Sequence, residues 1–173
     1  MDLGNLLFDV IRVVHIVGAV FWLGFAAFSV LIVEPAIKAA GKQGGIISQG
    51  LFGNGRYGMI IAASGGLTIL AGIILYVWDM AKIPGFASTT SGIVFAIGGL
   101  FGIAGVIIGG AGAGRQANKM MALGKQIAAA GANPPAELMT QVAETQEKVF
   151  QFTRWAMGII FVALLCMASA RYL

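Results

Sequence analysis

The chain has 173 residues, of which 58% are hydrophobic and 10% are charged, and its formal net charge is +4. Its mean hydropathy of +0.89 is far above that of a soluble globular domain, so the composition indicates an integral membrane protein surrounded by a lipid bilayer. The positive charge needs no nucleic-acid partner, because the sequence has no basic surface motif with interleaved aromatic residues.

Four apolar stretches are long enough to cross the hydrocarbon core of a bilayer, which is about 30 Å thick and takes about 20 helical residues. They are Val10–Val33, Tyr57–Trp78, Gly92–Gly114 and about Val149–Tyr172. The second and third stretches contain no charged residue. The sequence therefore predicts one all-α domain, an integral membrane four-helix bundle with up-and-down topology.

The ends of the chain and its basic residues predict an orientation. Met1–Asp9 contains no lysine or arginine, so it lacks the basic region of a cleavable signal, and we expect the first helix to be retained. Eight basic residues lie between the first and second helices, between the third and fourth, or just inside the fourth, whereas three lie on the opposite side. The positive-inside rule then predicts a multi-pass protein of the plasma (inner) membrane with both termini outside.

The first apolar stretch carries the only histidine of the chain, His15. An ionisable side chain inside a membrane span costs free energy and is by default a candidate functional residue. Trp22 follows two helical turns later and Ser29 two turns after that, so the three side chains should share one face. Because Trp22 lies in mid-span, away from the interfaces where membrane tryptophans gather, we expect this face to point inward. Asp9 and Arg12, three residues apart, can pair at the outer end.

Two segments between the apolar stretches are predicted to be loops. Pro35 should end the first helix just after Glu34, and the glycine-rich segment Ala36–Arg56 should connect the first two helices. The shorter segment Asp79–Ser91 contains a Ser-Thr-Thr-Ser run that can cap the third helix.

Glycines four residues apart mark the third helix: Gly98 and Gly102, Gly105 and Gly109, and Gly110 and Gly114. Small residues at this spacing let helices approach closely in lipid. The alternative is a helix kept thin to leave room for a flat cofactor. Beyond the membrane, Arg115–Ala130 should extend this helix and Ala136–Phe152 should lead into the fourth helix, which together would form a cytoplasmic helical hairpin at about 115–150.

Cys166 and Met167 lie near the outer end of the fourth helix, at a depth similar to the roughly 8 Å expected for His15. Imidazole, thiolate and thioether ligands suit Cu(I) or a haem iron, so these three residues are the candidate metal ligands, with Arg12 and Trp22 as candidate cofactor-binding neighbours. In the alternative, the sulfur side chains fill the core. His15 would then be a neutral imidazole that is hydrogen-bonded to a carbonyl or hydroxyl group of a neighbouring helix.

The spacing His15-x6-Trp22-x-Gly24 resembles the opening of the copper-resistance D (CopD-like) membrane domains and of related four-helix membrane families. The close of the fourth helix, Met167-Ala-Ser-Ala-Arg171-Tyr172, and the entry into the second, Arg56 to Gly72, are also similar to those domains. The resemblance implies a membrane protein that binds or moves copper, with His15 as the residue that carries over.

The same opening is similar to that of the haem-associated protoporphyrinogen oxidases of the HemJ type. Those enzymes continue with a Pro-Arg-Leu-Phe-Val-Tyr-His-like stretch that carries a second histidine. The corresponding stretch here, Leu31–Lys38, has no histidine and has no arginine after its proline. This difference argues against that enzyme activity.

Two functions of different class remain open. The first is a CopD-like protein that binds or translocates copper, or holds a single haem b, through His15. The second is a small non-catalytic subunit of a larger respiratory or photosynthetic membrane complex, in which His15 is structural and the glycine faces serve assembly with other subunits or further copies. The sequence has no hydrolytic or phosphate-binding motif, so we expect no enzyme activity of its own.

Overall fold

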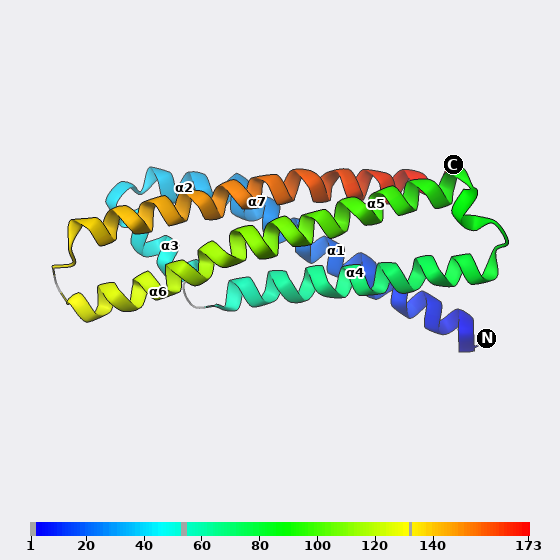
Figure 1. The fold of residues 1–173 in the computed structure, drawn as a ribbon, viewed down its shortest axis with the longest axis horizontal. Helices are drawn as coiled ribbons and strands as arrows, with labels where there is room; N and C mark the ends of the chain where they lie inside the picture. The colour runs from blue at the N-terminus through cyan, green and yellow to red at the C-terminus, as the bar shows by residue number, and fades with distance from the viewer. Residues whose placement is uncertain (1–2, 53–54, 132) are drawn as a thin grey trace.

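The computed structural model describes residues 3–52, 55–131 and 133–173, and within these ranges all regular elements are helical (Figure 1). Four helical runs are long and apolar enough to cross a membrane: Leu3–Ala39, Arg56–Lys82, Thr90–Ala130 and Ala136–Ala170. They form an elongated bundle with both termini at the same end (Figure 1). The predicted all-α bundle of four membrane helices is therefore confirmed, and the chain is a multi-pass membrane protein.

The first run consists of α1 (Leu3–Phe28), the π-helical segment η1 (Ser29–Val33) and α2 (Glu34–Ala39). The second is α4 (Arg56–Lys82), the third joins α5 (Thr90–Ile107), the π-helical segment η4 (Ile108–Gly114) and α6 (Arg115–Ala130), and the fourth is α7 (Ala136–Ala170). We call the end of the bundle that holds both termini the termini end, and the opposite end, where α6 meets α7, the hairpin end.

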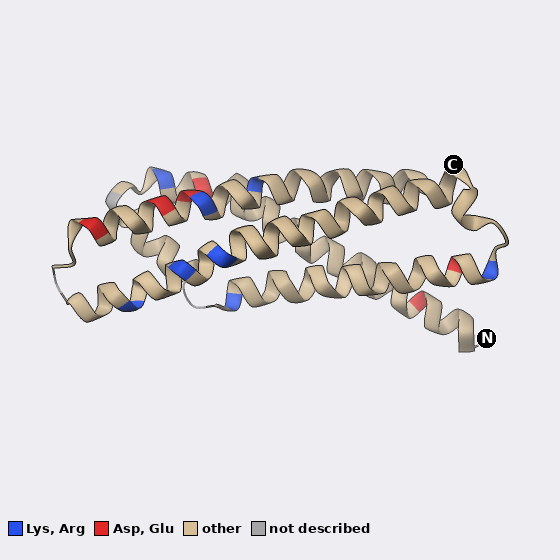
Figure 2. Ribbon diagram, viewed as in Figure 1, with Lys and Arg blue, Asp and Glu red and all other residues tan. Residues whose placement is uncertain are grey.

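The runs are longer than a bilayer core requires. The 35 residues of α7 span about 53 Å, against about 30 Å of hydrocarbon. Most charged residues gather in the half of the bundle toward the hairpin end, and along α7 they reach as far as Arg154 (Figure 2). The charged hairpin end therefore projects beyond the apolar part of the bundle.

α1 and α4 pack through large side chains that lie on glycines. Trp22 lies on Gly65, where an added Cβ would come within 3.1 Å of the indole ring. Seven residues away on each helix, His15 lies on Gly72 in the same manner. Between these two contacts the roles are reversed, because Gly18 of α1 receives a side chain of α4. The prediction that His15 and Trp22 share a face is confirmed.

The third run presents glycines to α7. Gly98 contacts Cys166 and Met167, Gly105 contacts Ile160, and Gly112 contacts the ring of Phe152. Side chains of α7 thus occupy the space beside these glycines, which agrees with the close helix packing expected from their spacing. A Cβ added at Gly110 would meet no atom within 4 Å beyond its own helix backbone, so Gly110 faces away from this contact.

The prediction that the first helix ends at Pro35 is wrong, because the chain stays helical through η1 and α2 to Ala39. Pro35 lies in the first turn of α2 directly after η1, so its missing N–H group falls where the α-helical hydrogen-bond pattern is already interrupted. The π-helical segment η1 connects α1 to α2 without a break in the helix. Its hydrogen bonds span five residues, as in the bond from the N–H group of Glu34 to the carbonyl of Ser29.

The prediction that Ala36–Arg56 is a loop is also wrong over most of its length. The segment forms the end of α2, a 3-10 turn at Gly41–Gln43 and the helix α3 (Gly44–Phe52). Tertiary burial overrides the low helix propensity of its glycines, because both ends of the segment contribute to a buried cluster at the hairpin end. That cluster consists of Ile37, Phe52, Met120, Leu123, Val142 and Phe150. We call residues 34–52 the cap.

Two local predictions agree with the structure. Thr89 is the N-cap of α5, and its hydroxyl accepts a hydrogen bond from the N–H group of Gly92 at 3.0 Å. α6 covers Arg115–Ala130, the residues expected to extend the third helix, and is followed by Gly131 at a positive φ of 72°. A glycine at this position ends a helix without strain.

Candidate functional site

His15 is half-buried on the face of α1 that contacts α4. Its Nδ1 atom donates a hydrogen bond to the backbone carbonyl of Thr68 over 2.8 Å. Because a carbonyl oxygen only accepts, this bond places the proton of the neutral imidazole on Nδ1. Nε2 then carries the lone pair and is the nitrogen that can bind a metal ion.

Two features of α4 fix the orientation of the imidazole ring. Gly72 leaves room for it: a Cβ at this position would lie 2.9 Å from Cε1 and 3.1 Å from Nδ1 of His15. The hydroxyl of Thr68 donates to the carbonyl of Ser64 at 2.7 Å, so it is already satisfied within its own helix. The ring is therefore positioned by the backbone of α4 and by the absence of a side chain at Gly72.

The depth of His15 follows from its partner on α4. Gly72 precedes Trp78 by six residues, which is about 9 Å along the helix. Trp78 contacts Phe8 of α1 near the termini end, with 5.9 Å between the ring centroids. His15 thus lies inside the apolar part of the bundle, as its position in the sequence predicts.

The two predicted neighbours of a cofactor lie in different surroundings. Arg12 is exposed, with its guanidinium 3.9 Å from the carboxylate of Asp9 and 4.7 Å from the ring centroid of Phe8, so the predicted pair with Asp9 is confirmed. Trp22 is 5% exposed and lies between Gly65 and Gly105 in the core. Packing accounts for the position of Trp22, and a role in cofactor binding stays a prediction for both residues.

The predicted sulfur ligands lie at the contact between α5 and α7, whereas His15 lies at the contact between α1 and α4. A Cβ at Gly98 of α5 would lie 3.0 Å from Cβ of Cys166 and 3.2 Å from Cε of Met167. His15, in contrast, contacts Thr68 and Gly72 of α4. Within the described ranges no group of three or more His, Cys, Asp or Glu residues is placed to hold a metal ion. Metal binding by His15, Cys166 and Met167 therefore stays a prediction.

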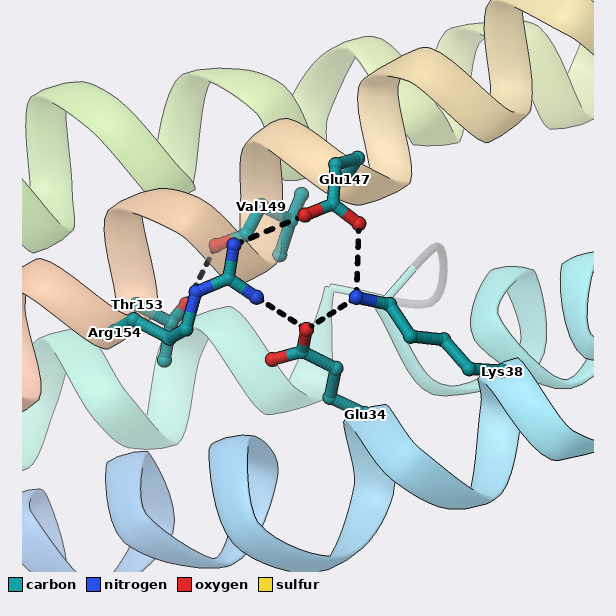
Figure 3. Close-up of polar contacts among 6 residues, drawn as sticks. All are labelled: Glu34, Lys38, Glu147, Val149, Thr153 and Arg154. Atoms are coloured by element: carbon teal, nitrogen blue, oxygen red, sulfur yellow. Dashed lines mark hydrogen bonds and ion pairs between the residues drawn. The ribbon is translucent and has the colours of Figure 1, made fainter.

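Four charged side chains that the sequence did not predict to interact form a ring toward the hairpin end (Figure 3). Glu34 accepts hydrogen bonds from Lys38, at 2.7 Å, and from Arg154. Glu147 lies 3.3 Å from the ammonium group of Lys38 and accepts a hydrogen bond from Arg154 at 2.9 Å. Each carboxylate thus contacts both cations, and the four charges form a closed ring, which we call the ion ring.

The members of the ion ring differ in exposure. The side chain of Glu34 is 8% exposed, whereas those of Lys38 and Glu147 are each 52% exposed. Burial of a carboxylate is costly unless cations and hydrogen bonds compensate it, and Arg154 supplies both to Glu34. Glu147 lies beyond the apolar stretch of α7, and the hydrogen bond from Arg154 lowers its pKa, with a further contribution from Lys38.

The π-helical segment η1 directs Glu34 toward α7. The buried residues of the first run recur at three or four positions through Gly18, Trp22, Ala26 and Ser29, and the next one, Glu34, comes five positions later. A π-helical turn inserts one residue into the α-helical repeat, so it shifts the inward face from Val33 to Glu34.

Part of the ion ring could have been found in the sequence. Glu34 and Lys38 are four residues apart and Glu147 and Arg154 are seven apart, so each pair shares one helix face. The contact between the two pairs depends on η1, for which the sequence gives no clear signal.

No family model, no curated protein and no solved structure matches this chain.

Proposed function

We propose that this chain is a membrane protein of the CopD-like type that holds one metal centre, a haem or a copper ion, on Nε2 of His15. The observation that supports this proposal is the 2.8 Å hydrogen bond from Nδ1 to the carbonyl of Thr68, a contact that a purely structural histidine also makes. Metal-ligating histidines commonly donate their other ring N–H group to a carbonyl or a carboxylate, which fixes both the tautomer and the ring orientation. Gly72 supports the same orientation from below the ring.

Of the two centres, a haem demands less from the chain. The porphyrin supplies four nitrogen ligands, so one imidazole is enough for a five-coordinate iron. A copper ion held by side chains needs further nitrogen or sulfur ligands, and Cys166 and Met167 lie against Gly98. A second protein ligand for either metal would come from another copy of the chain or from a partner subunit.

We also propose in which membrane the chain lies and on which side its termini lie. We place the chain in the plasma (inner) membrane with the termini end outside, because the basic residues concentrate at the hairpin end (Figure 2). His15 would then lie close to the outer face, where an exchanged ligand or electron could reach it.

An absorption spectrum with metal analysis of the gently solubilised protein tests the proposal. We expect a haem Soret band or stoichiometric copper in the wild type and its loss in His15→Ala. His15→Asn is the matched control for folding, because its amide can still donate to the carbonyl of Thr68 while it offers no imidazole to a metal. A colourless and metal-free wild type, or an unchanged spectrum in both variants, would contradict the proposal.

A second function, that of a non-catalytic subunit in a larger membrane complex, would use the exposed surface of α1. The half of α1 near the termini end presents a broad apolar surface that includes Val10, Val13, Ile16, Val17 and Val20, all exposed. Such a surface meets lipid or the helices of another subunit.

The assembly hypothesis calls for its own variants. Gly102 and Gly105 are buried inside the bundle, so bulky residues there would disturb the fold itself. A Cβ added at Gly66 or Gly99 would meet no atom within 4 Å beyond its own helix backbone, so these two glycines are better probes of assembly. Loss of co-purifying subunits in Gly66→Leu or Gly99→Leu, with His15→Ala still assembled, would favour the second function over the first.

A further inference from the structure

The cap, residues 34–52, joins the bundle through two unusual backbone features. On one side it follows the π-helical segment η1 and begins with Glu34 and Pro35. At the other connection, the residue before α4 is Gly55, which has a positive φ of 75°. Because η1 interrupts the α-helical hydrogen-bond pattern between α1 and α2, the cap can change its angle to the bundle about η1.

The contact between the cap and α7 is apolar in one part and charged in another. A groove of about 240 Å³ lies between Ile37, Gly41 and Gly45 of the cap and Met139, Val142 and Ala143 of α7, so packing is incomplete there. The ion ring crosses the same contact: Glu34 of the cap pairs with Arg154, and Lys38 of the cap pairs with Glu147 (Figure 3).

Arg154 differs from Lys38 because it is held on α7 and not on the cap. Lys38 is one turn from Glu34 on α2, so this pair would move together with the cap. Arg154 is the cation that α7 contributes to Glu34, which is the buried carboxylate of the ring. Without Arg154, Glu34 would be buried with half of its counter-charge, and opening of the cap would return it to water.

We propose that the ion ring is an ionic latch, which keeps the cap closed over the buried cluster at the hairpin end. Loss of the Arg154 contacts lets the cap swing away from α7 about η1, while the membrane part of the bundle stays folded. This device is independent of any metal bound at His15.

The accessibility of a buried thiol tests the latch. Ser48 lies on α3, is fully buried and has its hydroxyl 3.9 Å from the sulfur of Met120. In the solubilised, intact chain with Cys166→Ser, the thiol of Ser48→Cys should react slowly with a maleimide. Adding Arg154→Gln should raise the reaction rate about tenfold or more, because an uncompensated buried carboxylate is strongly unfavourable. An unchanged rate would overturn the latch.

A second probe separates opening of the cap from unfolding of the bundle. Ser64 is buried on α4 in the membrane part of the protein, so Ser64→Cys in the same background reports on that part. We expect its reaction rate to stay the same when Arg154→Gln is added. Equal acceleration at both probes would mean that the whole bundle opens, and it would also overturn the latch.

Two further variants test the electrostatic cause. Lys148→Gln removes an exposed cation of α7 for which the described part of the chain forms no ion pair, and it should leave both rates unchanged. Adding Glu34→Gln to Arg154→Gln removes the buried charge and should return the Ser48→Cys rate toward that of the parent. Persistent fast labelling in this double variant would show that Arg154 acts through packing, which would contradict an ionic latch.

Discussion

The imidazole of His15 lies directly on Gly72, so close that a Cβ on the glycine would come within 2.9 Å of the ring. The contact sets the rotamer that lets Nδ1 reach the carbonyl of Thr68. A residue with no obvious chemistry, Gly72, therefore decides how the only histidine of the chain is presented.

We expect Gly72→Ala to displace the imidazole and to break its hydrogen bond, with a loss of about 1–3 kcal/mol in the free energy of unfolding. Thermal unfolding of the solubilised protein measures this loss. Gly66→Ala is the matched control on the same helix, because Gly66 has open space around it. There the added methyl group should be neutral or should stabilise the helix by up to about 1 kcal/mol. Equal stability of the two variants would contradict the proposed contact.

Trp22 should be the residue of α1 that contributes most to packing of the membrane core. It is 5% exposed and contacts glycines on both α4 and α5. Trp22→Ala leaves a cavity that these glycines cannot fill, so we expect a loss of about 3–5 kcal/mol in the free energy of unfolding. Phe28→Ala removes an aromatic ring that is 54% exposed and should cost much less. A similar loss for the two variants in a chemical unfolding series would show that Trp22 is not buried in the core.

The fold was predictable from the sequence where the signal is local. The apolar stretches locate the membrane helices, and the spacing of His15 and Trp22 identifies the inward face of α1, since helical periodicity depends only on neighbouring positions. The N-terminal capping of α5 by Thr89 is predictable for the same reason.

The cap and the ion ring were not predictable, because both depend on contacts between distant segments. The glycines of residues 36–56 favour a loop on propensity alone, and only burial of Ile37 and Phe52 against α6 and α7 makes the segment helical. Glu34 and Arg154 are 120 residues apart, and they meet only because η1 turns Glu34 inward.

In the candidate site, too, the sequence predicts local features but not contacts between distant segments. The sequence identifies His15 as an isolated ionisable residue in a membrane span, but it cannot show which helix His15 contacts. The sequence places Cys166 and Met167 at the same depth as His15. Depth does not determine the face of a helix, and both sulfur side chains contact Gly98.

Gly112 should limit how closely the third run and α7 approach each other. It lies at the end of η4 that leads into α6, and its Cα faces the ring of Phe152. We expect Gly112→Leu to force the ring aside and to lower the midpoint of thermal unfolding, at a cost of about 1–3 kcal/mol or more. Gly110→Leu is the control, because a Cβ two residues away at Gly110 would meet no atom within 4 Å beyond its own helix backbone, and it should keep the wild-type midpoint.

The ion ring makes stability at the hairpin end depend on pH. The hydrogen bond from Arg154 lowers the pKa of Glu147 below its usual value of 4.5, so the folded state favours the ionised carboxylate. A group of this kind stabilises the folded state above its unfolded pKa, and the stabilisation is lost as the pH falls through the lowered, folded value. We therefore expect the wild type to lose stability progressively below pH 4.5.

Glu147→Gln should be less stable than the wild type at neutral pH and should lose less stability on acidification, because its side chain binds no proton in this range. Thermal unfolding across a pH series measures the difference between the two proteins. Glu144→Gln, on the same helix and outside the ion ring, should keep the wild-type dependence. If Glu147→Gln and the wild type respond equally to acid, the ionised state of Glu147 does not stabilise the contact between the cap and α7.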